Sequence, residues 1–167
     1  MNKIILTTVV LFSTICCNAQ LNNINNDEFG QSIKFNNISL GDIMVASGDL
    51  TKMRDLFGNS IQEKPNNTGP FIGKDIYNNK LYFHFEDETD TGNNYDLTYI
   101  KVKSNYVTVN VKGLSIKLGD DKSKFKNFLF NVNDSSYNFT DADTGSVGLS
   151  FEIDKHDKVS AIELICF

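Results

Sequence analysis

The sequence predicts an α+β fold of two tandem β-α-β-β repeats, which form a mainly antiparallel sheet with short helices packed on one face. Three observations support this prediction. Four segments recur in the same order along the chain, two of them alternate between apolar and polar residues, and another has apolar residues at helical spacing. With 167 residues, 40% hydrophobic and 22% charged, the chain is long and apolar enough to form a packed core.

The repeats are predicted to span residues 30–104 and 105–167, after a signal peptide at 1–19 and a polar segment at 20–29. The matching pairs of segments are 38–42 with 116–120, 51–59 with 123–131, 81–86 with 149–154, and 97–102 with 159–164. The first repeat also carries an insertion at 43–48. Units of this size are marginally stable alone, so we expect the repeats to form one domain with a shared sheet or core.

Each repeat is expected to begin with a strand, at 32–40 or at 106–118, and the second of these bends near Gly113. A short helix follows, with Asp49 or Asp121 as its N-cap. The buried face of this helix is formed in the two copies by Met53, Leu56 and Phe57 and by Phe125, Phe128 and Leu129.

A hairpin completes each repeat. The first strand of the hairpin places Leu81, Phe83 and Phe85 on one face, matched in the second copy by Leu149, Phe151 and Ile153. Alternation of this kind indicates one packed face and one solvated face. The turn is formed by residues 154–157 in the second copy and by a longer acidic loop, 87–96, in the first. The closing strands bury Ile100 and Val102, or Ile162 and Leu164.

The order of these segments resembles the repeats of the SmpA/OmlA and beta-lactamase-inhibitor-protein-like superfamily. In the second copy, the residues that carry the resemblance are Leu118-Gly119-Asp120, Phe125, Phe128-Leu129, 151–154 and 158–162. The proline that usually follows the helix in such repeats is absent after Phe57-Gly58 and after Phe130-Asn131. The resemblance implies a non-enzymatic envelope module that binds another protein, often across an open sheet face.

Residues 1–19 have the pattern of a secretory signal peptide, because Lys3 precedes an apolar run and the segment ends in the small residue Ala19. The apolar run is far shorter than the ~20 residues of a membrane-spanning helix. We therefore expect an exported protein, periplasmic or secreted, with cleavage after Ala19 and no membrane span. A lipid anchor on Cys16 or Cys17 is the alternative, although neither cysteine follows the small residue normally found there.

The charge of the chain narrows the class of partner. The net charge is −5, it becomes −6 once Lys3 is removed with the signal peptide, and Arg54 is the only arginine. Nucleic-acid binding requires a concentrated basic surface, so we expect a protein partner, with a basic one favoured by the acidic charge. Cys166 is the only cysteine beyond the signal peptide, and its place in the apolar alternation predicts a buried thiol.

No local motif identifies a catalytic residue, a metal site or a cofactor. The Asp-Thr-Gly triplets at 90–92 and 143–145 resemble those of aspartic proteases, but they lie in polar segments that do not desolvate the aspartates, so we interpret them as turns. His84 and His156 lack the further ligands of a zinc site. Weak calcium binding stays open for the acidic residues Asp87, Glu88, Asp90 and Asp141.

The solvated face of the hairpins provides the candidate site. The residues predicted to contact a partner protein are Tyr82, His84, Glu86, Tyr99, Lys101, Glu152 and Glu163. Tyrosine beside mixed charges suits a protein interface, because the ring offers a large contact area with few rotamers. The leading hypothesis is an exported, non-enzymatic binding module of the inhibitor or immunity-protein type. The alternatives are an envelope assembly or maintenance adaptor of the SmpA/OmlA type and, third, an unrecognised hydrolase whose residues converge from distant positions.

Overall fold

The computed structural model describes residues 23–24, 26–66, 70–89, 91–128, 130, 135–141 and 147–166. The predicted signal peptide, the two cysteines within it and the Asp-Thr-Gly triplet at 143–145 lie outside these residues. In the described part of the chain, no helix is both long enough and apolar enough to cross a membrane.

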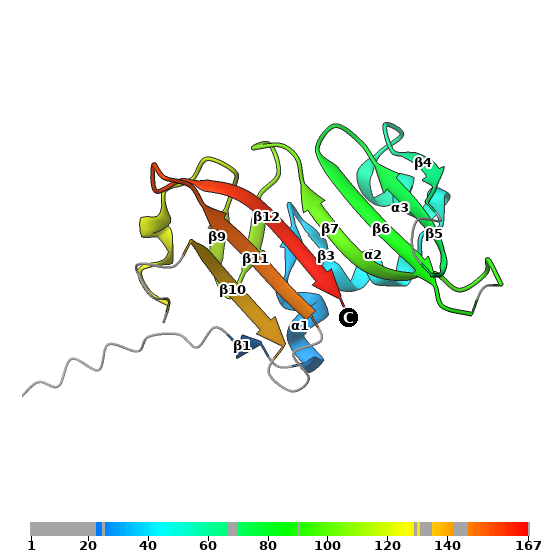
Figure 1. Ribbon diagram of the computed structural model, residues 1–167, viewed down its shortest axis with the longest axis horizontal. Coiled ribbons are helices and arrows are strands. Elements are labelled where there is room, and N and C mark those ends of the chain that lie inside the picture. Colours follow the sequence, from blue (N-terminus) through cyan, green and yellow to red (C-terminus); the bar gives the residue numbers. More distant parts are fainter. Residues whose placement is uncertain are drawn as a thin grey trace, which may run out of the picture.

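The strands form two sheets (Figure 1). The larger has the order β1 (Asn23–Ile24), β10 (Ser136–Asp141), β11 (Val147–Ile153), β12 (Val159–Cys166), β7 (Asp96–Val102), β6 (Leu81–Asp87), β5 (Ile72–Tyr77) and β4 (Gln62–Pro65). The smaller has the order β3 (Ile38–Ser39), β2 (Lys34–Phe35), β8 (Val109–Val111) and β9 (Leu114–Ile116). All neighbouring strands are antiparallel except β1 and β10, which are parallel.

The helices are few and short. They are α1 (Asn26–Ser32), α2 (Leu40–Ala46), α3 (Leu50–Phe57) and the 3-10 helix η1 (Lys122–Phe125). Figure 1 shows the larger sheet in front, with the helices and the smaller sheet behind it. The prediction of an α+β fold with mainly antiparallel strands is thus confirmed. The second sheet was not predicted, because strands of two or three residues are too short to show a period-two pattern.

The hydrophobic core lies between the larger sheet and the layer behind it. Phe83 and Phe151 project into the core from the larger sheet and Phe35 from the smaller one, and all three side chains are almost completely buried. A single cluster contains apolar residues from both predicted repeats. The described parts of the two halves therefore share one core.

The segments predicted as entering strands are hairpins. In the range 32–40, a turn at Asn36 (φ 57°) joins β2 to β3, and α2 then begins at Leu40. In the range 106–118, Lys112 and Gly113 have φ values of 48° and 78° and reverse the chain between β8 and β9. Asparagine and glycine adopt the left-handed region more easily than other residues, which favours a reversal at these points over a continuous strand.

Each half consequently holds more strands than the predicted β-α-β-β unit. The hairpin β2–β3 is followed by α2, α3 and β4 to β7, whereas β8–β9 is followed by η1 and β10 to β12. The insertion at 43–48 forms the larger part of α2 and the turn after it. The segment 20–29, expected to be a polar extension, contains β1 and the start of α1, whose Phe29 is buried against the core.

The strand order of both sheets is symmetric about the junction between the predicted halves. From that junction outward, the larger sheet reads β7, β6, β5 on one side and β12, β11, β10 on the other. The smaller sheet reads β2, β3 on one side and β8, β9 on the other. Two copies of one unit related by a two-fold rotation would give this order. The duplication itself stays a prediction.

The helix α3 has the boundaries expected from its caps. The carboxylate of Asp49 accepts hydrogen bonds from the backbone N–H groups of Thr51 (2.8 Å) and Lys52 (3.0 Å), and Gly58 ends the helix with a φ of 87°. Met53 is fully buried, as its helical spacing predicts. In the second half, Asp121 caps η1 by accepting from the backbone of Ser123.

Replacing Asp49 with alanine is expected to lower the free energy of unfolding by about 1 kcal/mol, because two N–H groups at the helix start lose their acceptor. Urea unfolding of the variant measures this loss. Asp55→Ala, at an exposed position of the same helix, is the matched control and should change stability by less than about 0.5 kcal/mol. Equal effects of the two substitutions would show that the cap does not stabilise α3.

Candidate functional site

The larger sheet has one face that points away from the helices and the smaller sheet, which we call the open face (Figure 1). Cross-strand pairing arranges its side chains in two rows. The first row is Gln62, Tyr77, Tyr82, Lys101, Glu163, Ser150 and Asn138, and the second is Lys64, Asp75, His84, Tyr99, Ile165, Gly148 and Thr140. Each row crosses seven strands, so the open face is continuous over both predicted halves.

All seven residues predicted from the sequence lie on the open face. Five belong to the two rows, Glu86 follows His84 on β6, and Glu152 on β11 is paired with Ala161 next to Glu163. The alternation of β6 places its three predicted residues on this face. Leu81, Phe83 and Phe85 are buried, and the residues between them are partly exposed. The common placement of these residues is therefore confirmed, and their role in binding a partner stays a prediction.

The centre of the polar contacts is Asp75, which sequence analysis did not single out. Its side chain is almost fully buried, and one carboxylate oxygen accepts hydrogen bonds from the Tyr82 hydroxyl (2.6 Å) and the Asn66 amide (2.9 Å). The other oxygen lies 3.1 Å from the Lys64 ammonium. Burial by itself would raise the pKa of Asp75, but these donors and His84 outweigh it and lower the pKa to about 2.

His84 lies between two carboxylates. Its Nδ1 is 2.9 Å from Oδ1 of Asp75, and its Nε2 is 3.0 Å from Oε1 of Glu86. Only the doubly protonated imidazolium donates hydrogen bonds to both carboxylates at once. Because both ring nitrogens are already engaged, His84 acts here as a bridge between β5 and β6 and is poorly oriented to serve as a metal ligand or a general base.

A second set of contacts joins the two halves of the sheet at β7 and β12. The Lys101 ammonium is 2.7 Å from the Glu163 carboxylate. Burial, and then the interaction of the Tyr99 hydroxyl with Glu163, raise the pKa of Tyr99. The Tyr99 ring is in edge contact with the Tyr82 ring, with centroids 6.0 Å apart. The two sets of contacts therefore meet at the tyrosine pair.

Gly73 allows a close contact between β5 and the segment after β4, at the edge of the sheet. A Cβ atom at this position would collide with the carbonyl oxygen of Asn66 and lie 3.0 Å from Cε1 of His84. The absence of a side chain lets the segment after β4 approach β5 closely enough for Asn66 to reach Asp75.

Tyr82 is predicted to ionise late in an alkaline titration. Burial, and then the hydrogen bond to Asp75 and the charge of that carboxylate, raise the pKa of Tyr82 from 10 to about 12. The folded state thus holds a proton that the unfolded state loses, so this contribution to stability is complete below pH 10 and decreases as the pH rises towards 12.

The ultraviolet absorbance of tyrosinate measures this titration. Tyr82→Phe should remove one late-titrating group from the curve, and Tyr106→Phe, at a side chain that is 78% exposed, is the matched control. A curve of Tyr82→Phe that keeps its late component unchanged would contradict the contact with Asp75.

The acidic loop after β6 is held together by Asp87. The sequence placed this residue in the loop, but it lies at the end of β6 and its side chain is fully buried. Its carboxylate accepts hydrogen bonds from Thr89, Thr91, Asn93 and Asn94, and the Thr89 hydroxyl contributes most to lowering its pKa. Asp87 therefore fixes the turn that follows β6. Of the other residues considered for calcium, Glu88 is exposed and the side chains of Asp90 and Asp141 lie outside the described residues.

Among the residues that the structure describes, no group of three or more histidine, cysteine, aspartate or glutamate side chains is arranged to hold a metal ion. Cys166 is partly buried and packs against the core, in agreement with the sequence prediction, and burial raises the pKa of its thiol to about 11. Such a thiol is a poor nucleophile at neutral pH.

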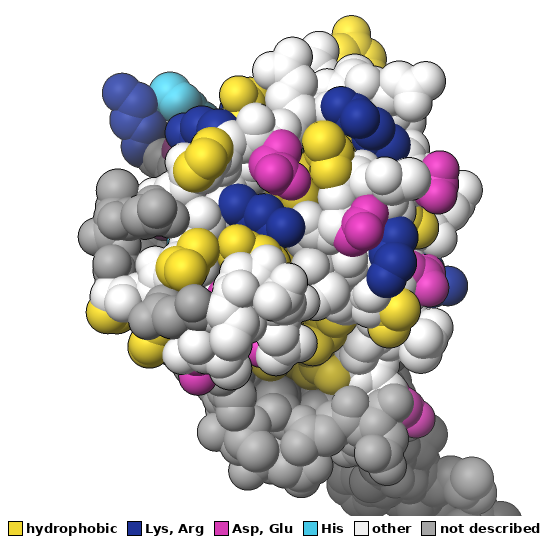
Figure 2. Space-filling model, turned by 90° about the vertical axis from the view of Figure 1, so that its right-hand side faces the viewer, with side chains coloured by type: hydrophobic (Ala, Val, Ile, Leu, Met, Phe, Trp, Pro, Cys, Tyr) yellow, Lys and Arg dark blue, Asp and Glu magenta, His cyan; other side chains and the backbone are white. Residues whose placement is uncertain are grey.

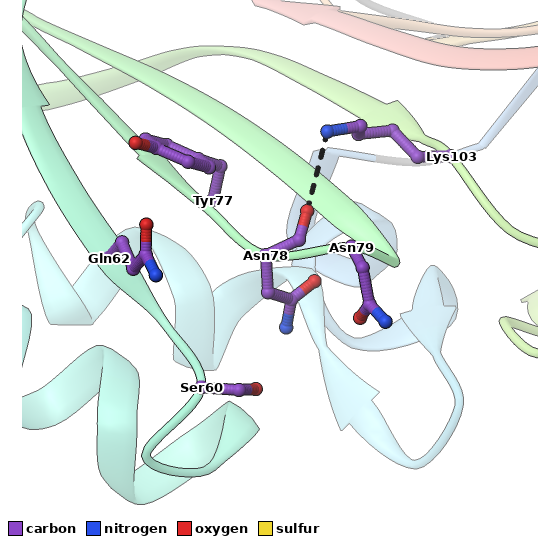
Figure 3. A pocket seen from close by; sticks show the side chains of 6 residues that line it. All are labelled: Ser60, Gln62, Tyr77, Asn78, Asn79 and Lys103. Atoms are coloured by element: carbon purple, nitrogen blue, oxygen red, sulfur yellow. Dashed lines mark hydrogen bonds between the residues drawn. The ribbon is translucent and has the colours of Figure 1, made fainter.

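A polar hollow of about 420 Å³ lies where the first row meets the β5–β6 turn (Figure 3). It is lined by Ser60, Gln62, Tyr77, Asn78, Asn79 and Lys103. The Lys103 ammonium reaches the Asn78 carbonyl oxygen at 3.4 Å, and the Asn78 side chain accepts from the backbone of Lys80 and Leu81. These groups stabilise the turn, and the hollow brings no acid–base pair together.

The residues of the edge strand β4 disfavour pairing with a further strand. It carries Glu63, Lys64 and Pro65, and all its residues are exposed. Charged residues and proline disfavour the addition of another strand at a sheet edge. Figure 2 shows that acidic and basic side chains are interspersed over this end of the molecule. The open face is therefore a better candidate for a binding surface than the β4 edge.

Comparisons with known proteins gave no match. No protein-family model matches the chain, and neither a curated protein nor a solved structure matches it at the significance threshold applied. The function must therefore be inferred from the fold and from the chemistry of the open face.

Proposed function

We propose that this protein is an exported, non-enzymatic module that binds another protein across the open face of its larger sheet. Inhibitors and immunity proteins act in this way. The sequence features of residues 1–19 support export, and the symmetric strand order supports two repeats, at 30–104 and 105–167, that together build one binding surface. The resemblance of the segment order to the SmpA/OmlA and beta-lactamase-inhibitor-protein-like superfamily agrees with this proposal.

The observation that carries the proposal is the contact network on the open face. Polar side chains from β4 to β12 are held by one another, through Asp75 in one half and Glu163 in the other. Side chains that are already ordered lose little conformational entropy when a partner binds. A surface of this kind, with two tyrosines at its centre, is preorganised for a protein interface.

Photocrosslinking tests the proposal. A photoreactive side chain is placed at Asn138, which is exposed on the open face, or at Lys52, which is exposed on α3 behind the sheet. We expect one envelope protein to be captured from position 138 and not from position 52. Equal capture from both positions, or capture from position 52 alone, would contradict the proposal.

The captured protein is then purified and its affinity for the unmodified chain is measured. Tyr99→Ala should weaken binding by at least about tenfold, because a central tyrosine is a frequent source of binding energy. Wild-type affinity of this variant, with an unchanged fold by circular dichroism, would also contradict the proposal. The identity of the partner separates the two roles: a toxin or enzyme indicates inhibition or immunity, and an assembly component indicates an envelope adaptor.

A further inference from the structure

We propose that a second binding site lies behind the β10 end of the larger sheet, where a hollow lined by aromatic rings binds a small aromatic carboxylate. We call it the aromatic hollow. It lies on the other side of the sheet from the open face, so this proposal goes beyond the proposed function and does not depend on it. The lining residues are Lys122, Ser123, Phe125, Lys126, Phe128, Phe130 and Tyr137.

The aromatic hollow lies where the second half of the chain has a shorter helix than the first. Behind β6, α3 has eight residues, whereas η1 has four. The hollow beside η1 and β10 has a volume of about 230 Å³. Pockets for drug-sized ligands measure roughly 300–1,000 Å³, and an apolar cavity of roughly 150 Å³ holds one benzene ring. The volume therefore suits a single ring with a short polar substituent.

The walls of the hollow favour an aromatic ligand. The Phe130 and Tyr137 rings are stacked with centroids 4.7 Å apart, and the Phe125 ring meets the Tyr137 ring edge-on at 4.9 Å. The Phe128 ring lies 6.0 Å from the Phe130 ring. The ring of a ligand can make stacked and edge contacts of the same kind, which stabilise aromatic pairs beyond the effect of the area that they bury. An alkyl chain lacks this additional stabilisation.

A buried hydroxyl group in the wall has no hydrogen-bond partner among the residues that the structure describes. This hydroxyl belongs to Tyr137, which is only 4% exposed. A buried hydroxyl is normally paired, because leaving it unpaired is costly. Tyr137 is paired with Phe151 across the sheet, and Ile76 is paired with Phe83 at the corresponding place in the first half. An aliphatic residue is thus sufficient for the core there, and the hydroxyl is available to an acceptor on a ligand.

Two lysines supply positive charge at the hollow, although the chain as a whole is acidic. The Lys122 ammonium is 2.8 Å from the Asp157 carboxylate. Lys126 is exposed, and its ammonium forms no ion pair within the described part of the chain. A carboxylate on the ligand offers an acceptor to the Tyr137 hydroxyl and a counter-charge to Lys126. A cationic ligand would be repelled by both lysines, so the hollow fits an anion.

An NMR titration of the nitrogen-15-labelled full chain with phenylacetate tests this proposal. We expect saturable shift changes with a dissociation constant of about 1 mM or below. The largest changes should occur at Phe125, Phe128, Phe130 and Tyr137. Shift changes that do not saturate, or that are largest on the open face at Tyr82 and Tyr99, would overturn the proposal.

Two related compounds separate the effect of the ring from that of the charge. Phenethyl alcohol has the same ring without the charge, and it should bind about fivefold more weakly than phenylacetate. Hexanoate has the carboxylate without the ring, and it should bind about threefold more weakly. Affinity equal to that of phenylacetate for either compound would overturn the assignment of the ligand as an aromatic carboxylate.

Tyr137→Phe keeps the ring and removes the hydroxyl, so it should weaken binding of phenylacetate about fivefold. It should not lower the free energy of unfolding, because the hydroxyl that is removed is buried and unpaired. Tyr106→Phe, at a side chain that is 78% exposed, is the matched control and should leave the affinity unchanged. Unchanged affinity of Tyr137→Phe would overturn the role of this hydroxyl in the site.

Lys126→Gln tests the charge at the hollow. It should weaken binding of phenylacetate about threefold, because an exposed ion pair is lost, and leave binding of phenethyl alcohol unchanged. Lys52→Gln removes the same charge from an exposed position of α3 and should leave both affinities unchanged. Equal losses of phenylacetate binding in the two lysine variants would show non-specific attraction of an anion and overturn the proposal.

Discussion

Replacing Phe151 with alanine is expected to lower the free energy of unfolding by about 3–5 kcal/mol. Its side chain is fully buried on β11, and its ring lies 5.2 Å from the ring of Phe125 and 6.0 Å from that of Phe139, measured between centroids. Removal of the ring leaves a cavity among aromatic side chains that are held by further ring contacts, such as Phe125 with Tyr137 and Phe139 with Phe128, so the surroundings close over it only in part. Urea unfolding followed by circular dichroism measures the loss.

Phe83→Ala is the matched variant in the first half. Phe83 is equally buried, lies on β6 at the place corresponding to Phe151, and contacts the Phe57 ring at 5.0 Å. Because both halves contribute to one core, each variant should unfold in one transition at a lower urea concentration. Two separate transitions in either variant, with only the mutated half destabilised, would show that the halves fold independently.

Replacing Asp75 with alanine is expected to lower the free energy of unfolding by about 3 kcal/mol, because the donors of Tyr82, His84 and Asn66 lose a buried charged acceptor. The matched control is Asp96→Asn, which removes a charge from an exposed position opposite Glu86. We expect the control to remain within about 0.5 kcal/mol of the wild type. Similar losses in both variants would mean that general charge, and not the contacts of Asp75, stabilises the fold.

The pH dependence of stability gives an independent check on Asp75. Its pKa is about 2 in the folded state, below its ordinary value of 3.8, so the unfolded state takes up the proton first as the pH falls. The contribution of Asp75 is therefore complete above about pH 4 and decreases as the pH falls towards 2. The difference in stability between the wild type and Asp75→Ala should shrink over this range. A difference that stays constant down to pH 2 would contradict the assignment.

The elements with clear periodicity were predicted well from the sequence. The alternation around Phe83 and Phe151 located β6 and β11, and the cap at Asp49 with the spacing of Met53 located α3. The same alternation placed all seven candidate residues on one face. These predictions succeed because side-chain direction in a strand or helix follows directly from local sequence.

The parts that were missed depend on tertiary contacts. In β5 a charged residue, Asp75, is buried, while Lys74 lies with its ammonium 3.8 Å from the centroid of the Tyr95 ring, so the polarity pattern of a strand is obscured. The hairpins of the smaller sheet have strands too short for a period to be recognised. Asp75 was therefore missed as the centre of the site, and only the abundance of donors on the neighbouring strands, such as Tyr82 and His84, gave a signal for it.

Oxidative footprinting of the tyrosines, with and without the purified partner, tests the central claim most directly. Tyr82 and Tyr99 lie in the middle of the open face, whereas Tyr106 lies outside the sheet, between β7 and β8, and is 78% exposed. The proposed function predicts that the partner protects Tyr82 and Tyr99 from oxidation and leaves Tyr106 unchanged. Protection of Tyr106 with no change at Tyr82 and Tyr99 would show that the partner binds elsewhere and would contradict the proposal.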